Sequence, residues 1–502
     1  MKKAYINMVM SLVSKVVTVI TGLVLQRQLL VCYGSSLNGL TSSISQIMSY
    51  LVLLESGLGL ATIQVLYRPL IIKDENKVNE ILNTSSNEYK KIAGIFLALL
   101  LGISCLFPFI IKDDISFKIV FGLTFITGLN YVISYIFGSK YKALLNADQK
   151  IYVIQILDIV TIICSCILRI IAIKNGLNII YVQIINVMCA IAKIAGLNIY
   201  VKIKYKYLDT KIPVNKALLK KRWNVLVHNL AGIVVNQTDI MILTIFSSLK
   251  TVSIYSVYNM VFGQLSTILQ TTFMSAPQST FGELYNKDKI AFKKYYRMYE
   301  YVYSILLFIV CTIAVVMIIP FVKIYTEGIK DTSYVYWELP LLFMIILFMN
   351  QIRIPMLMTI NISGKFKETQ NGAILEAVIN IVVSLFLFFQ TNLGLKGLLI
   401  GTICSYLFRT LDIIIYVYHN ILEDKITRYI KFIIVNIVIM VGMIYTLYFR
   451  YPISVSGYIH WFVKAIIIGM LTVIIYIFTN ALLFNNQFRE ICKYLKKKCR
   501  IK

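Results

Sequence analysis

The chain has 502 residues, of which 58% are hydrophobic and only 15% are charged, and its formal net charge is +27. Together with a mean hydropathy of +0.76, this composition excludes a water-soluble globular protein. Fourteen apolar runs make up most of the chain, and each is near the roughly 20 residues that a helix needs to cross a bilayer core. Backbone polar groups in hydrocarbon need internal partners, so we interpret these runs as transmembrane helices of an all-α polytopic membrane protein.

The predicted spans follow one another with short connections. In chain order they are 5–31, 40–66, 92–111, 117–137, 151–173, 178–200, 224–246, 253–277, 299–323, 335–360, 371–390, 394–418, 429–449 and 457–484. Polar residues interrupt the second, seventh and tenth spans. An alternative with twelve spans and two re-entrant or interfacial segments therefore stays open.

The connecting segments differ in charge from one side to the other. If the N-terminus is cytoplasmic, the inner segments carry 34 Lys and Arg residues and the outer segments carry 5. This asymmetry follows the positive-inside rule and predicts a multi-pass membrane protein with cytoplasmic N- and C-termini; the resemblance given below implies that the membrane is the bacterial cell membrane. It also accounts for the net charge, because basic loops lie near anionic lipid headgroups. No basic domain stands apart from the spans, so nucleic acid is not an expected partner.

The sequence gives no indication of a catalytic site outside the membrane spans. The longest outer segment, 324–334, has only about eleven residues, and we find no phosphate-binding loop, HExxH, GxSxG or kinase motif. The nine Cys residues show no metal-ligand spacing with His and no disulfide framework. We therefore expect neither an enzyme nor a bound cofactor or metal, and no ATP site.

A basic segment divides the chain. Residues 202–222 carry eight basic residues and separate six spans from the next six. We predict an N-lobe at 1–200, a connector at 201–223, a C-lobe at 224–418, two further helices within 419–484 and a basic tail at 485–502. The turns YGSSLNGLTSSISQ (33–46) and IFSSLKTVSIYSVYN (245–259) are similar. They favour parallel repeats with a substrate path between them, although Ser-rich turns also recur by chance.

Ionisable residues inside spans are costly and by default functional. Glu55 precedes Gly57 and Gly59, which favour a bend, and Asp239 lies in a polar collar, NQTD. Arg353 precedes Pro355, which removes a backbone donor and favours a local break. The alternative for each is an interhelical hydrogen bond or ion pair.

Two further pairs lie on single helices. Glu376 and Asn380 are four residues apart and share a face. Arg409 and Asp412 are three apart and are expected to pair with each other. Lys193 lies near a span end and is expected to extend toward the headgroups.

Four collinear stretches resemble the bacterial Wzx-type polysaccharide flippases of the multidrug/oligosaccharidyl-lipid/polysaccharide exporter superfamily, in their Gram-positive form. They are YGSSLNGLTSSISQIMSYLVLLESGLGLATIQVLY (33–67), NQTDIMILTIFSSLKTVSIYSVYNMV (236–261), IRIPMLMTINISGKFKETQNGAILEAVIN (352–380) and GLKGLLIGTICS (394–405). The resemblance implies two six-helix lobes in a V plus two C-terminal helices. It also implies alternating access and a polyprenyl-diphosphate oligosaccharide as cargo.

The resemblance assigns the diphosphate-binding role to two arginines, and the chemistry of the other polar and aromatic side chains in the spans suggests theirs. Arg27 and Arg353 would receive the diphosphate. Gln46, Tyr255 and Tyr258 would contact sugar, with packing as the alternative. The polar residues proposed for binding, coupling or gating are Glu55, Asp239, Glu376, Asn380, Arg409 and Asp412. Coupling to membrane potential, a cation or a proton stays open.

The alternative functions differ from this one in the transported molecule or in the class of protein. Span eight (253–277) contains no Arg or Lys, which weakens the resemblance to lipid II flippases. A cation-coupled multidrug exporter, a membrane polysaccharide polymerase and a non-transporting scaffold are the alternatives. For the flippase, a polymerase and glycosyltransferases for capsule, exopolysaccharide or wall polymer are the expected partners.

Overall fold

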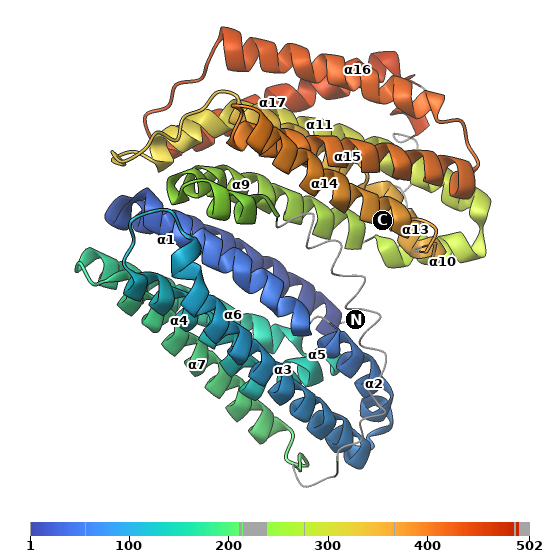
Figure 1. Ribbon diagram of the computed structural model, residues 1–502. Helices are drawn as coiled ribbons and strands as arrows, with labels where there is room; N and C mark the ends of the chain where they lie inside the picture. The colour runs from blue at the N-terminus through green and yellow to red at the C-terminus, as the bar shows by residue number, and fades with distance from the viewer. Residues whose placement is uncertain are drawn as a thin grey trace. The chain divides into compact units, whose positions relative to one another are not determined.

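The computed structural model describes residues 2–55, 57–209, 213, 238–275, 277–365, 367–485 and 488–490. In these ranges every regular element is a helix (Figure 1). Eleven of the described helices are long and apolar enough to cross a membrane, so the all-α polytopic class is confirmed. The count falls below fourteen for three reasons. The first two predicted spans share one helix, the helix over most of the predicted span 253–277 (α9, Leu249–Gln270) is not among the eleven, and the span 224–246 lies mostly outside the described residues.

The contacts divide the chain into two compact units. The first comprises Met1–Ile254 with Gly328–Thr332, and the second comprises Tyr255–Glu327 with Ser333–Lys502. The predicted connector 201–223 and basic tail 485–502 lie mostly outside the described residues, so the predicted lobe boundaries stay a prediction.

Besides a helical stretch at 238–246 and the first turn of the helix after it, the first unit has seven described α-helices and a short 3-10 helix. These are α1 (Lys2–Leu51), η1 (Val52–Glu55), α2 (Leu58–Ile72), α3 (Glu75–Ile110), α4 (Phe117–Phe137), α5 (Ser139–Ala147), α6 (Ile151–Lys174) and α7 (Ile179–Lys204). The predicted break between the first two spans is a kink at Gly34, where φ is 83°. The predicted bend after Glu55 is also present, because the helix stops at η1 and restarts at α2.

One sequence-based expectation for this unit is wrong. The predicted spans 40–66 and 92–111 leave 67–91 as a polar connection between helices, but α3 begins at Glu75, sixteen residues before the end of that segment. The Asp74 side chain caps the helix by accepting a hydrogen bond from the backbone N–H of Lys77 at 2.9 Å. Val78, Ile81 and Tyr89 are buried, so this polar segment has one apolar helical face.

The second half of α1 packs on residues 238–254 within the first unit. A Cβ added to Gly39 would lie 1.9 Å from the carbonyl oxygen of Leu249, so only glycine permits this approach. Asn38 donates a hydrogen bond to the Ser253 hydroxyl at 2.7 Å. The two similar Ser-rich turns of the sequence therefore lie against each other.

The second unit contains the remaining helices. They are α9 (Leu249–Gln270, shared with the first unit), α10 (Gln278–Lys287), α11 (Lys289–Tyr325), α12 (Leu339–Ile352), α13 (Ile354–Ser363), α14 (Gln370–Gln390), α15 (Leu395–Val417), α16 (Thr427–Ile444) and α17 (Tyr458–Leu483). Short π-helical turns follow α9, α15 and α16, at Thr271–Ser275, Tyr418–Leu422 and Tyr445–Arg450.

The last two helices pack on α11 (Figure 1). Asn436 of α16 and Asn480 of α17 exchange side-chain hydrogen bonds at 3.2 and 2.8 Å, and both are buried. Trp461 of α17 donates a hydrogen bond to the Met317 carbonyl of α11 at 2.9 Å. Paired amides and an anchored indole give α16 and α17 fixed positions in the second unit.

Candidate functional site

Arg353 lies at a break between two helices of the second unit. Helix α12 ends at Ile352 and α13 starts at Ile354, with Pro355 in its first turn. Proline is tolerated there because the first N–H groups of a helix have no partner within it. The predicted break is confirmed, and it places the Arg353 guanidinium in the interior, where the residue is only 7% exposed.

The guanidinium of Arg353 has three contacts. It forms an ion pair with Glu376 of α14, with Nη1 and Oε1 2.6 Å apart, and Nη2 donates to Asn350 at 3.0 Å. Its Cζ also lies 4.8 Å from the centre of the Tyr406 ring of α15. Arginine combines these contacts because its planar group donates in its plane and stacks on its face.

Glu376 joins Arg353 to a second ion pair. Its other carboxylate oxygen lies 3.7 Å from Nε of Arg409, and Arg409 in turn pairs with Asp412 at 2.5 Å. The predicted Arg409–Asp412 pair is thus confirmed. We call Arg353, Glu376, Arg409 and Asp412 the arginine cluster.

The arginine cluster is balanced in charge and open at one edge. Two guanidinium groups face two carboxylates, and the side chains of Arg353, Glu376 and Arg409 are at most 9% exposed. Asp412, at 37% side-chain exposure, is the accessible end. A Cβ on Gly372 would lie 2.1 Å from the Asp412 carboxylate, so a glycine leaves room for the pair.

Asn380 continues the polar face of α14 one turn beyond Glu376. Its amide nitrogen donates to Thr402 at 3.1 Å and to Ser405 at 3.4 Å. The predicted shared face is confirmed, since both Glu376 and Asn380 are buried. Among the described residues, the buried Oδ1 of Asn380 has no hydrogen-bond partner.

A second polar group surrounds Glu55 in the first unit. The Glu55 carboxylate hydrogen-bonds to the Tyr89 hydroxyl of α3 and is attracted by Lys142 of α5. Lys142 itself donates to Ser134 at 3.0 Å. The break at η1 therefore sets a carboxylate opposite a cation in the helical bundle.

Nearby, Lys193 of α7 forms an ion pair with Asp158 of α6 at 2.8 Å. Lys193 thus has an interhelical partner, and its extension toward the headgroups stays a prediction. Pairing with a carboxylate on the adjacent helix satisfies the ammonium within the bundle.

The other predicted residues lie apart from the arginine cluster. Arg27 is partly buried in α1 and Gln46 is buried in the same helix. Asp239 is also buried and belongs to the first unit. Of the polar collar around it, only Thr238 and Asp239 lie within the described residues.

The two tyrosines of α9 are buried in the second unit. Tyr258 donates to the carbonyl of Tyr334 at 2.7 Å, and its ring stacks on Phe343 with centroids 5.8 Å apart. Tyr255 is 7% exposed and contacts the same phenylalanine ring at 5.2 Å. These contacts favour the packing alternative, and sugar binding by either tyrosine stays a prediction.

Sequence reasoning missed three contributors to these sites. Tyr89 and Lys142 were assigned to inner connections, and Tyr406 looked like one more aromatic residue in a span. The spacing of Val78, Ile81, Leu82 and Tyr89 was the available signal for a helix at Tyr89. No local pattern marked Lys142 or Tyr406, since each acquires its role from a neighbouring helix.

No protein-family model matches the chain, and no curated protein matches it. Among solved structures, the lipid II flippase MurJ in an inward closed conformation has a TM-score of 0.67 at 14% identity, covering 96% of this chain and 99% of that one. An inward-facing multidrug resistance MATE family transporter of the MOP superfamily has a TM-score of 0.63 at 13% identity, covering 80% and 93%. A MATE protein in the bent conformation has a TM-score of 0.53 at 12% identity, covering 89% and 97%.

These similarities define the class of fold. The chain has the helical fold that MATE transporters share with the lipid II flippase MurJ. At such identities the likeness concerns the fold, and function has to be argued from the polar sites.

Proposed function

We propose that the chain is a flippase that moves a polyprenyl-diphosphate-linked oligosaccharide from the inner to the outer leaflet by alternating access. The cargo would serve capsule, exopolysaccharide or wall polymer synthesis, with glycosyltransferases before this step and a polymerase after it. The arginine cluster is the observation that carries the proposal. Two guanidinium groups within a bundle of membrane helices match an anionic head that cannot cross hydrocarbon unaided.

The geometry supports a partner exchange at Arg353. Its ion pair with Glu376 occupies one edge of the guanidinium, whereas its buried Nε makes no hydrogen bond with a described residue. A phosphate offers two oxygens to such a group. In the proposed cycle, cargo phosphate replaces Glu376 on Arg353, and Glu376 is retained by Arg409, which already lies 3.7 Å from it.

The exchange of partners at Arg353 also offers a way to couple transport to a proton or a cation. When Glu376 loses Arg353, its charge requires a proton, a cation or a closer approach by Arg409. Glu376, Asn380, Arg409 and Asp412 are therefore the proposed coupling and gating residues, with Asp239 and Glu55 as separate acidic candidates. Arg27 and Gln46 remain proposed cargo contacts of the first unit.

The direct test follows the cargo between leaflets. We expect Arg353→Ala to abolish export at normal membrane levels of the protein, and lipid-linked oligosaccharide to accumulate on the inner leaflet. Arg450→Ala, which removes an exposed arginine, is the matched control and should export normally. Normal surface polymer in the Arg353→Ala strain would refute cargo binding by Arg353. A normal outer-leaflet pool without polymer would indicate a polymerase.

A multidrug exporter is the second candidate, because a MATE transporter has nearly the same TM-score as the lipid II flippase. The paired Glu55 in the first unit would then serve a cationic drug or a coupling ion. Deletion of the gene should in that case lower resistance to cationic compounds and leave surface polymer unchanged. The flippase proposal expects unchanged resistance to cationic compounds and a loss of surface polymer.

A further inference from the structure

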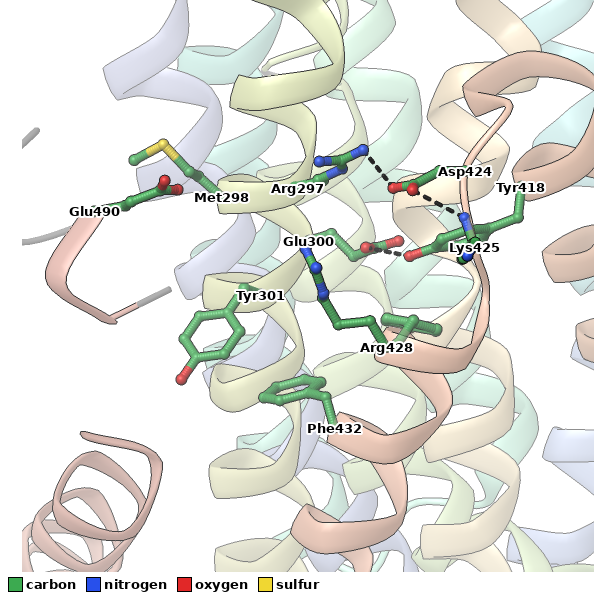
Figure 2. Close-up of a pocket in the computed structure, with 11 residues that line it drawn as sticks. Arg297, Met298, Glu300, Tyr301, Tyr418, Asp424, Lys425, Arg428, Phe432 and Glu490 are labelled. Atoms are coloured by element: carbon green, nitrogen blue, oxygen red, sulfur yellow. Dashed lines mark hydrogen bonds and ion pairs between the residues drawn. The ribbon is translucent and has the colours of Figure 1, made fainter. Parts of the chain in front are cut away.

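The start of α16 borders a cavity in the second unit. A cavity of about 640 Å³ is lined by Tyr418, His419, Glu423, Asp424, Lys425, Thr427 and Arg428. An adjoining pocket shares Tyr418, Asp424, Lys425 and Arg428 and reaches Arg297 and Glu300 of α11 (Figure 2). The proposed transport cycle makes no use of this region.

The acidic residues of this cavity are already engaged. Asp424 pairs with Arg297 at 2.5 Å and Glu423 pairs with Lys293 at 3.1 Å. The Glu300 carboxylate accepts hydrogen bonds from the hydroxyls of Tyr418 at 2.7 Å and Tyr296 at 3.2 Å. Glu423 and Asp424 are therefore neutralised by cations of α11, and Glu490 is a further carboxylate that lines the adjoining pocket.

Three basic side chains remain on α16 and the turn before it. Lys425, Arg428 and Lys431 are exposed, and their side chains form no ion pair or hydrogen bond with another described residue. Figure 2 shows Arg428 extending from α16 toward α11. The hydrogen bond from Lys293 lowers the pKa of Glu423, and Lys289 and Lys365 add to this effect. Because Glu423 and Asp424 are paired with Lys293 and Arg297, the positive charges of Lys425 and Arg428 in the cavity lining are left over.

An apolar groove continues from the cavity along α16. It is lined by Thr427, Ile430, Lys431, Ile434 and Val435, and it shares Thr427 with the cavity. Ile430 and Ile434 are 43% and 55% exposed, and Val438 one turn further is 66% exposed. A cationic cavity followed by an apolar groove on a transmembrane helix matches an amphiphile with an anionic head.

We propose that the cavity at the start of α16 binds the phosphate headgroup of an anionic phospholipid, with an acyl chain along the α16 groove. Arg428 suits the phosphate because its fork meets two oxygens, while Lys425 and Lys431 flank it as point charges. The charge distribution predicts that this end is cytoplasmic, where anionic lipids attract basic residues. Glu490 of the chain's own tail lines the adjoining pocket, but residues 485–502 carry seven Lys and Arg, so the tail as a whole is too basic to fill a cationic cavity.

This site is independent of the transported cargo, and it gives α16 and α17 a role that the proposed cycle lacks. Because α16 packs on α11, an occupied site would fasten the C-terminal pair to the second unit at its predicted cytoplasmic end.

The test measures lipid binding to the purified, delipidated full chain by native mass spectrometry. Phosphatidylglycerol and phosphatidylcholine with the same acyl chains are the two probes, and we expect at least a tenfold preference for the anionic lipid. The triple variant Lys425→Gln, Arg428→Gln, Lys431→Gln should weaken phosphatidylglycerol binding on the order of a hundredfold, at about fivefold for each basic residue. The matched control replaces Lys90, Lys202 and Lys206, all exposed, and should stay within twofold of the parent.

A second variant tests the groove. Ile434→Trp should reduce phosphatidylglycerol binding about tenfold, whereas Ile459→Trp on the exposed surface of α17 should not. Equal binding of both lipids, or equal losses in the two triple variants, would overturn the proposal. Displacement of phosphatidylglycerol by polyprenyl diphosphate at one tenth of its concentration would assign the site to cargo lipid instead.

Discussion

At the scale of single residues, four ionisable side chains of the second unit meet beside one helix break, in the arginine cluster. Pro355 predicts the break at Arg353, and the spacing of Arg409 and Asp412 predicts their pairing. The ion pair between Arg353 and Glu376 was not predictable, because it depends on how α14 and the α12–α13 break both pack on α15. A buried ion pair contributes little net stability, but the loss of one partner costs about 3–5 kcal/mol.

Losing one partner of the pair costs stability, whereas losing both costs little. Single and double variants can therefore distinguish a structural role of Arg353 from cargo binding. Arg353→Gln and Glu376→Gln should each lower the unfolding temperature, because each leaves one buried charge with fewer partners. The double variant removes both charges and should recover most of the loss. If Arg353 binds cargo, the double variant still fails to export. Thermal unfolding in detergent and a surface-polymer assay measure the two effects, and recovery of export by the double variant would show that the pair is only structural.

At the scale of helices, the pattern of apolar residues predicts where the helices lie. Small residues determine how closely neighbouring helices pack. The predicted spans 117–137 and 371–390 match α4 and α14 to within one residue at each end. The segment 67–91 failed as a connector because Val78, Ile81 and Tyr89 form one buried face of α3, and polar residues such as Asn79 and Glu88 are buried beside them. Close packing of α14 and α15 depends on Gly401, where an added Cβ would lie 2.6 Å from the Cα of Ser384.

We therefore expect Gly401→Ala to destabilise the second unit. The methyl group would meet backbone rather than a flexible side chain, and overpacking of this kind costs about 1–3 kcal/mol. Gly442 in α16 has open space around it, so Gly442→Ala should be neutral or slightly stabilising, since alanine favours helix. Unfolding temperatures of the two variants in the same detergent test this. Equal temperatures would show that α14 and α15 separate readily.

At the scale of the whole molecule, the difference in charge between the two sets of loops is the main evidence for the orientation of the chain in the membrane. The 34 basic residues of one set of loops against 5 of the other predict cytoplasmic termini. Packing alone does not reveal which end of a helix bundle faces the cytoplasm, and the asymmetry does.

Orientation can be tested by cysteine labelling in intact cells. A membrane-impermeant thiol reagent should label Lys330→Cys directly, whereas Lys287→Cys should react only after permeabilisation. Both side chains are exposed, so access to the reagent depends on the side of the membrane. The parent chain provides the background from its native cysteines. Labelling of Lys287→Cys before permeabilisation would invert the predicted topology.

The sequence by itself determined the helical membrane class, most of the spans, the breaks at Gly34, Glu55 and Arg353, and the predicted orientation. These features follow from local hydropathy, glycine, proline and loop charge. Only the tertiary structure decided which charges meet. Glu55 faces Lys142, and Arg353 reaches Glu376 and, through it, Arg409. The physical reason is that a buried charge is stabilised by partners from other helices, and their positions depend on packing across the whole unit.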